Sequence, residues 1–197
     1  MQVINQYETD EGKRANRYDA TVLVNGLPLV HIELKRRGVD IKDAFNQINR
    51  YQNDSFWAGS GLYEFVQIFV ISNGTYTKYY SNTTRQSHIS ENSGISSKKG
   101  KKTSNSFEFT SWWADRKNKP IIDLIDFAKT FFAKHTILSI LTKYCIFTSD
   151  EMLMVMRPYT PQATKNRIAS LAFGSNNFRN CFQISYNFSI FVFSYSI

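Results

Sequence analysis

The sequence predicts an α/β domain, and three observations support this fold class. Residues 17–35 alternate as two strands around an Asn-Gly turn. An amphipathic helical pattern begins at residue 41, and a second pair of strands covers residues 64–81. A chain of 197 residues is long enough for one domain with a core, or for one domain plus a fragment of the next.

The first strand pair carries acidic side chains at positions where they can meet. Strict alternation places Asp19 on one face of residues 17–24 and Glu33 on one face of residues 29–35. Directly opposed residues of an antiparallel pair share a face, so Asp19 opposes Glu33 if the turn is residues 25–27. A two-residue turn would put the two acids on opposite faces. We therefore expect a turn of three or five residues between these strands.

The next elements are a helix and a second strand pair. Apolar residues recur at helical spacing after Asp40, which is the expected N-cap. They are Ile41, Ala44, Phe45 and Ile48. Residues 64–71 are expected to form a buried strand, and Asn73-Gly74 turns the chain into a strand at residues 75–81.

The second half of the chain is expected to add an insertion and two helices. Residues 82–106 are polar and rich in Ser, Asn and Lys, so we predict a mobile insertion without a catalytic role. Pro120 is expected near the start of a helix that extends through residues 121–132. A further helix is predicted at residues 136–143.

The net charge of +8 makes an anionic partner plausible, although a basic surface without a partner fits the charge equally well. Four arginines, Arg14, Arg17, Arg36 and Arg37, bracket the two strands that carry the acids. Guanidinium groups suit phosphate oxygens, so we expect these side chains to contact phosphates. Ordinary solvated arginines at strand ends are the alternative.

Cysteines and apolar segments point to a cytoplasmic protein without a membrane partner. Cys145 and Cys181 offer neither a disulfide framework nor the spacing of a metal site, which fits a reducing compartment. Residues 1–4 do not form a signal peptide. The uncharged stretch from Phe182 to Ile197 has 16 residues, fewer than the roughly 20 that span a bilayer.

An acid on one strand followed by Glu-x-Lys on the next is typical of a metal-dependent nuclease. The carboxylates of Asp19 and Glu33 would bind a hard divalent cation, and the carbonyl between Glu33 and Lys35 would add a third ligand. Mg²⁺ in such a site activates a water and offsets charge on the phosphate. Lys35 would orient that water or stabilise the pentacovalent state.

The short motif alone is weak, because [DE]-x-K occurs at residues 11–13, 33–35, 40–42 and 115–117. Only residues 33–35 end an apolar strand, follow a strand with an acid and precede an amphipathic helix. Without that context, a strand-end Glu–Lys pair is a surface ion pair worth at most about 1 kcal/mol.

Gln47 and Tyr51 lie four residues apart, on one face of the expected helix. Such a pair most often packs at the edge of a core. At this distance after Glu-x-Lys, however, it is a recognisable nuclease signature.

These segments together resemble the nuclease domain of the restriction (motor) subunit of Type I restriction–modification enzymes. The resemblance is carried by "NRYDATVLVNGLPLVHIELKRRG" and "AFNQINRYQND", and it runs from about Val3 to about Asn82. It is weaker through "SWWADRKNKPIIDLIDFAKTFF". It implies a PD-(D/E)xK (restriction-endonuclease-like) core, a central mixed sheet flanked by helices that is partial at its N-terminus. Asp19 and Glu33 would be the metal ligands, Lys35 the catalytic lysine, and Gln47 with Tyr51 the accessory motif.

The resemblance also implies the function and the partners. The expected activity is Mg²⁺-dependent cleavage of duplex DNA in a complex with modification and specificity subunits, with ATP used only by the full-length motor subunit. The expected organisation is an endonuclease domain at residues 1–148, the start of a helicase domain at 149–169 and an unrelated apolar, aggregation-prone tail at 170–197.

Three departures from the family pattern leave a second interpretation open. Many relatives have Pro where this chain has Tyr18, and at the helicase start Thr160-Pro161 follows Tyr159 where the family has Gln. The upstream lead-in of the family is also absent, so we expect a truncated or partial chain. The alternative function is a catalytically silent fragment that at most binds DNA or partner subunits.

Overall fold

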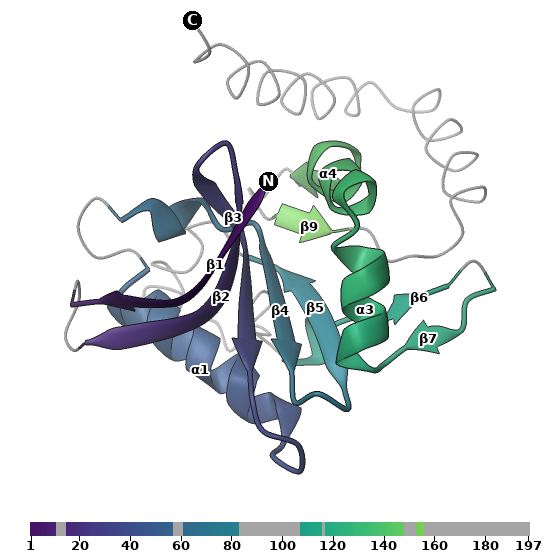
Figure 1. The fold of residues 1–197 in the computed structure, drawn as a ribbon, viewed down its shortest axis with the longest axis horizontal. Coiled ribbons are helices and arrows are strands. Elements are labelled where there is room, and N and C mark those ends of the chain that lie inside the picture. Colours follow the sequence, from purple (N-terminus) through teal and green to yellow (C-terminus); the bar gives the residue numbers. More distant parts are fainter. Residues whose placement is uncertain (11–14, 57–60, 83–106, 116, 148–152, 156–197) are drawn as a thin grey trace, which may run out of the picture.

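The computed structural model describes residues 1–10, 15–56, 61–82, 107–115, 117–147 and 153–155 (Figure 1). Five strands form one sheet in the order β1-β2-β3-β4-β5. Their bounds are β1 Gln2–Thr9, β2 Asn16–Val24, β3 Leu27–Leu34, β4 Ile68–Ser72 and β5 Thr77–Ser81. Strands β3 and β4 run parallel and the other neighbours antiparallel. The predicted α/β class with a mixed sheet is therefore confirmed.

Helices and two small strand pairs complete the described part of the chain. The helices are α1 Ile41–Asp54, α3 Leu124–Phe131 and α4 Lys134–Lys143, with short 3₁₀ turns η1 Leu62–Phe65 and η2 Phe107–Phe109. The small strand pairs are β6 Trp113–Ala114 with β7 Pro120–Ile121, and β8 Cys145–Phe147 with β9 Leu153–Val155. None of the helices in the described ranges is long and apolar enough to cross a membrane.

The sheet has a different cover on each face (Figure 1). Helix α1 packs on one face, where Phe69 and Ile71 of β4 join its apolar residues in one buried cluster. Helices α3 and α4 pack on the other face, where Ile68 and Val70 of the same strand lie in a second cluster. We call these the α1 face and the α3/α4 face. Their separation follows from the period of two along a strand.

The turn between β2 and β3 differs from the prediction. Asn25 and Gly26 both have positive φ, 52° and 83°, as a two-residue type I′ turn requires. Val24 accordingly pairs with Leu27. The predicted three- or five-residue turn is therefore wrong.

A register shift between Val22 and Leu23 adds the residue that the short turn lacks. Beyond the shift, Ala20 pairs with Ile32. This is the register that a three-residue turn would have produced, and its continuation places Asp19 opposite Glu33. Pro28 lies at the shift, opposite Leu23. Proline has no N–H for the ladder and is tolerated at such irregularities.

Three other expectations are corrected. Residues 64 and 65 belong to η1, and the buried strand begins only at Ile68. The strand expected at residues 75–81 begins at Thr77. Pro120 lies in β7, and Asp123 caps α3 instead, accepting from the backbone N of Ile125 at 2.8 Å.

Two predicted helix features are confirmed, and one strand was not anticipated. Helix α1 begins after Asp40, whose side chain accepts from the backbone N of Lys42 at 2.9 Å. Helix α4 covers the predicted residues 136–143. Strand β1 is mostly exposed and lacks the apolar alternation that would have predicted it.

Several expectations concern parts of the chain outside the described residues. These are the insertion from residue 83, the apolar tail from residue 170 and most of the expected helicase start. Within that start, Leu153–Val155 pairs with β8, and Leu153 packs in the cluster of the α3/α4 face.

Candidate active site

Asp19 lies at an interruption in β2. Tyr18 and Thr21 both point to the α1 face, although they are three residues apart, while Ala20 packs against the opposite face. Across β1, the pairs Asn5–Ala20 and Tyr7–Tyr18 leave Gln6 and Asp19 unpaired between them. Strict alternation is thus broken at Asp19.

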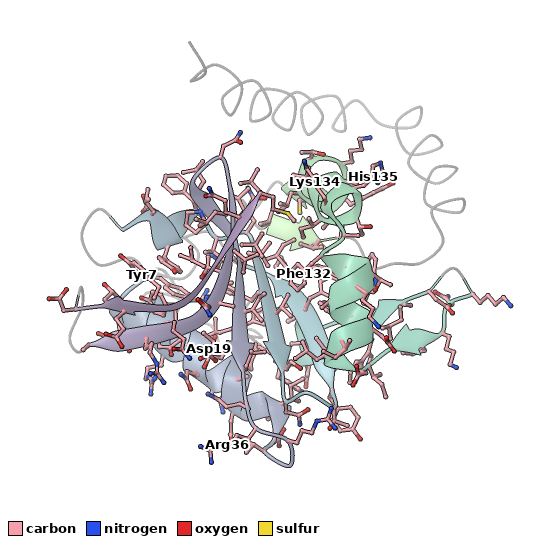
Figure 2. The ribbon with its side chains drawn as sticks, viewed as in Figure 1. Tyr7, Asp19, Arg36, Phe132, Lys134 and His135 are labelled. Carbon is pink, nitrogen blue, oxygen red and sulfur yellow. The ribbon has the colours of Figure 1, made fainter. Side chains whose placement is uncertain are left out.

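The break directs the Asp19 carboxylate to the backbone of β3. Its Oδ2 accepts a hydrogen bond from the backbone N of Leu34 at 2.8 Å. Leu34 is the residue between Glu33 and Lys35. The structure therefore brings Asp19 next to the Glu-x-Lys segment. Figure 2 labels Asp19 at the sheet.

Glu33, near the end of β3, and Lys35, which directly follows that strand, contact each other. The Lys35 Nζ lies 3.0 Å from Glu33 Oε1. Glu33 is completely buried, whereas 21% of the Lys35 side chain is exposed. This pair is therefore not the solvated surface ion pair that was the alternative.

The second Glu33 oxygen has no hydrogen-bond partner. Oε2 is buried, and within the described residues no donor reaches it at hydrogen-bonding distance. His31 Nε2 lies 3.6 Å from it. A buried carboxylate oxygen without a donor is unfavourable unless another positive group binds it.

Gln47 and Tyr51 extend the cluster from α1. Lys35 Nζ donates to Gln47 Oε1, and Gln47 Nε2 donates to the Tyr51 hydroxyl. Tyr51 in turn donates to the backbone carbonyl of Arg17 on β2, at 3.1 Å. The chain of donors orients the Gln47 amide and connects helix α1 to both acid-bearing strands.

The phenol of Tyr51 stays protonated in this environment. Burial raises its pKa, and the nearby carboxylates of Glu33 and Asp19 raise it further. A protonated hydroxyl is what the hydrogen bond to Arg17 requires. Tyr51 is therefore a structural donor and not a general base at neutral pH.

The described residues limit how a cation could be held. Within them, no group of three or more His, Cys, Asp or Glu side chains gathers at one point. A site built on Asp19 and Glu33 would thus consist of two carboxylates, completed by backbone or water oxygens. Mg²⁺ is commonly bound in this way, through one or two carboxylates with several waters retained.

The predicted arginines do not form part of the cluster. Arg17, Arg36 and Arg37 are exposed, and Arg14 lies outside the described residues. Figure 2 shows Arg36 extending away from the ribbon beyond the end of β3. Arg37 bends over the β4–β5 turn, where a Cβ added to Gly74 would lie 3.2 Å from its Cγ.

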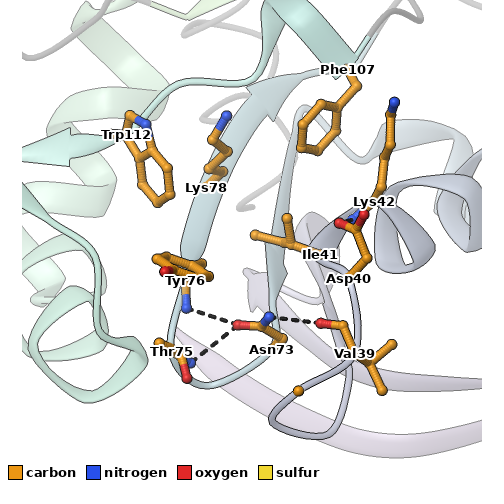
Figure 3. Close-up of a pocket in the computed structure, with 11 residues that line it drawn as sticks. Val39, Asp40, Ile41, Lys42, Asn73, Thr75, Tyr76, Lys78, Phe107 and Trp112 are labelled. Carbon is orange, nitrogen blue, oxygen red and sulfur yellow. Dashed lines mark hydrogen bonds between the residues drawn. The ribbon is translucent and has the colours of Figure 1, made fainter.

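A hollow of about 740 Å³ opens at the N-terminus of α1 (Figure 3). Lys42, Lys78, Phe107 and Trp112 are among its lining residues. Lys78 Nζ lies 4.7 Å and 4.8 Å from the ring centres of Phe107 and Trp112. Burial lowers the Lys78 pKa. The hollow includes none of Asp19, Glu33, Lys35, Gln47 or Tyr51.

Sequence reasoning missed the buried groups behind Glu33. His31 is fully buried, its Nδ1 lies 3.3 Å from Thr21 Oγ1, and Thr21 Oγ1 lies 3.0 Å from the Tyr63 hydroxyl. The position of His31 two residues before Glu33, on the same strand face, was the available signal. Nothing in the sequence pattern indicated Tyr63, which reaches the site from η1.

The fold and this cluster define an α/β domain with paired carboxylates beside a lysine, and comparison with known proteins specifies the class further. Residues 1–88 match the family model described as "Type I restriction enzyme R protein N terminus". The EcoprrI endonuclease subunit of a Type I restriction enzyme from Escherichia coli is 51% identical over 165 residues, covering 84% of this chain and 47% of that protein.

Two staphylococcal Type I restriction enzyme endonuclease subunits are also similar. The SsaAORF53P subunit of Staphylococcus saprophyticus is 40% identical over 178 residues, covering 90% of this chain and 17% of that protein. The SauCOLORF180P subunit of Staphylococcus aureus is 37% identical over 181 residues, with the same coverages. By these matches, the N-terminal part of the chain is similar to Type I restriction enzyme R proteins, and the longer matches are all to endonuclease subunits of such enzymes. The chain spans about half the length of the first of these relatives and about a sixth of the other two.

Proposed function

We propose that this chain carries a PD-(D/E)xK nuclease core that cleaves duplex DNA with Mg²⁺ within a Type I restriction system. The observation that carries the proposal is the environment of Glu33. One oxygen of this buried carboxylate binds Lys35 at 3.0 Å, and the other has no donor among the described residues. A carboxylate with a free buried oxygen beside a lysine suits a cation better than it suits a purely structural ion pair.

The donor set fits Mg²⁺. Glu33 Oε2 offers an unpartnered hard oxygen, and the hydrogen bond to Leu34 brings the Asp19 carboxylate to the same stretch of β3. Asp19 and Glu33 would hold the ion. The chemistry that bound Mg²⁺ supplies is polarisation of the phosphate and a lowered pKa of a coordinated water.

Lys35 is the group that acts on the reacting atoms in this proposal. Its ammonium would orient the attacking water and stabilise the negative charge that develops on the phosphate. Gln47 accepts from Nζ and therefore limits the positions that the flexible lysine side chain can take. Tyr51 fixes the Gln47 amide from the other side. Gln47 and Tyr51 would thus position Lys35 and take no part in proton transfer.

The proposed partners follow from the relatives. Type I restriction enzyme endonuclease subunits are named as parts of a restriction enzyme, so duplex DNA and the modification and specificity subunits are the partners we propose. We assign ATP use to the full-length motor subunit.

A plasmid cleavage assay tests the function. The full chain, alone and with modification and specificity subunits, would be incubated with supercoiled plasmid in Mg²⁺ or in EDTA. We expect Mg²⁺-dependent cleavage that E33Q and K35A abolish. K129A is the matched control for K35A, because Lys129 is 70% exposed on α3 and pairs with Asp126 on its own helix. Cleavage that survives E33Q would refute the site. No cleavage under any condition would favour the silent fragment.

A salt titration tests whether the arginines bind DNA phosphates. Removal of one phosphate-binding side chain should reduce the slope of log affinity against log salt by about one. We expect R36A with R37A to reduce the slope for duplex DNA, and K129A to leave it unchanged. An unchanged slope in the double variant would identify these two residues as ordinary surface arginines.

A further inference from the structure

His31 is a fully buried polar residue that the proposed mechanism does not use. Its Nε2 and Glu33 Oε2 face each other at 3.6 Å, and neither atom has a hydrogen-bond partner among the described residues. This separation exceeds the 2.7–3.2 Å of an ordinary N–H···O bond. A small rotation of the carboxylate would close it. Glu33 is the candidate metal ligand, so its unpartnered oxygen and the unpartnered nitrogen facing it need an explanation. A buried polar atom without a hydrogen-bond partner is costly.

The contacts of His31 favour the tautomer that carries its hydrogen on Nε2. Burial raises the Tyr63 pKa to about 12, so its hydroxyl carries a proton at neutral pH. If Tyr63 donates to Thr21 Oγ1, the Thr21 proton is free to donate to His31 Nδ1. Nδ1 is then the acceptor, and Nε2 carries the hydrogen. In the reverse tautomer the lone pair of Nε2 would face the carboxylate oxygen, which is repulsive.

Aromatic rings hold the imidazole in place. The ring centres of Tyr18, Phe56 and Phe69 lie 5.6, 5.3 and 6.3 Å from that of His31, and each contact is edge-to-face. The imidazole therefore cannot turn without displacing core side chains. The same rings exclude water, which strengthens the attraction between Nε2–H and the carboxylate.

We propose that His31 is a positioning residue, which holds the carboxylate of Glu33 in the rotation that presents Oε2 to a divalent cation. This inference rests on the proposed function, since it assumes that Glu33 is a metal ligand. A carboxylate oxygen has two lone pairs, so Oε2 can accept from Nε2–H and bind the cation together. His31 is not itself a ligand, because Mg²⁺ prefers oxygen and Nε2 is directed at Glu33. Lys35 acts on Oε1, so the two residues together determine the orientation of the carboxylate.

The test measures Mn²⁺ binding to the full chain without DNA, by electron paramagnetic resonance of the free ion. H31L removes the donor, and H31Q places an amide N–H at about the same reach. Groups that orient a metal ligand typically change metal affinity by about 10- to 100-fold when removed. We expect H31L to weaken Mn²⁺ binding at least tenfold and H31Q to restore most of the affinity. A role in packing alone would not distinguish these two variants in this way.

A second pair of variants covers the case in which H31L does not fold. T21V removes the hydroxyl that selects the tautomer and keeps the side-chain shape, whereas T21S keeps the hydroxyl. We expect T21V to weaken Mn²⁺ binding and T21S to remain within about twofold of the parent, a small change against the 10- to 100-fold loss expected when an orienting group is removed.

E33Q separates the failure of this inference from the failure of the proposed function. If the parent chain does not bind Mn²⁺, or if E33Q binds it as tightly as the parent does, the metal site and the inference are both refuted. If the parent binds Mn²⁺ through Glu33 but T21V and the folded His31 variants bind equally well, only the role of His31 is refuted. H31Q as weak as H31L would also refute it.

Discussion

The two faces of the central sheet are built from alternate residues of the same strands, yet they differ in chemistry. On β3, Val30 and Ile32 point to the α3/α4 face, where the buried cluster consists of aliphatic and aromatic side chains with one cysteine. His31 and Glu33 point to the α1 face, where polar groups are buried among tyrosines and phenylalanines. One strand therefore contributes to a conventional core and to a candidate active site.

The unpartnered polar atoms show the difference most clearly. Among the described residues, the buried side-chain atoms without a hydrogen-bond partner belong to His31, Glu33, Asn49, Gln52 and Tyr80. All five residues lie on β3, β5 or α1, on the α1 face. Burying such atoms lowers stability, and unfavourable arrangements of this kind concentrate at functional sites. We infer that the α3/α4 face supplies the stability and the α1 face carries the chemistry. Four predictions test this division, in order of their expected effect on unfolding free energy.

The largest loss should come from a truncation on the α3/α4 face. Phe127 is completely buried and stacks on Phe131, with ring centres 4.6 Å apart. F127A should lower the free energy of unfolding by about 3–5 kcal/mol, through lost burial and the cavity that remains. Urea denaturation measures the loss. A change below about 1 kcal/mol would show that this face is not the stabilising core.

The buried thiol of Cys145 should make stability fall at alkaline pH. Burial raises its pKa from 9.0 to about 12. Between these values the native state holds a proton that the unfolded state has lost, so stability decreases as pH rises above 9. From pH 8 to pH 10 this thiol should contribute a loss of about 1.4 kcal/mol. Comparison of the pH dependence of C145A with that of the parent measures it. Equal slopes would contradict the prediction.

The N-cap of α3 should have a smaller effect. Asp123 accepts from the backbone N of Ile125 at 2.8 Å and of Asp126 at 3.4 Å. D123A should destabilise the chain by about 1 kcal/mol, the usual loss when a capping side chain is removed. Thermal melting at matched pH is the measurement, and D123N, which retains an acceptor, is the control. Loss of the same size in both variants would argue against capping as the cause.

The smallest change in stability should accompany the loss of the site itself. E33Q removes a fully buried charge whose Oε2 has no donor, and relief of that desolvation cost offsets the loss of the ion pair with the partly exposed Lys35, which keeps an acceptor. The free energy of unfolding should therefore stay within about 1 kcal/mol of the parent. Mn²⁺ binding should nevertheless be lost. Calorimetric melting and Mn²⁺ titration of the same preparation test both statements. A large drop in stability together with unchanged metal binding would reverse the roles that we assign to the two faces.

Local sequence patterns determined much of the fold. The alternation before Asn25-Gly26 predicted β2, and the apolar spacing after Asp40 predicted α1 together with its cap. These features depend on neighbours within a few residues, so they can be read directly. The acid pair, Lys35, Gln47 and Tyr51 could also be proposed from spacing and family resemblance.

The tertiary structure alone decided how those residues meet. The short turn is compensated by a register shift opposite Pro28, and alternation is broken at Asp19, where the facing Gln6 has a positive φ of 49°. Tyr63 joins the site from η1, more than 40 residues after Thr21 in the chain. Strand register and such contacts depend on partners that are distant in sequence, and a shift of one residue moves every side chain to the other face. Sequence patterning therefore identified the reactive side chains, whereas long-range pairing determined which of them face the same point.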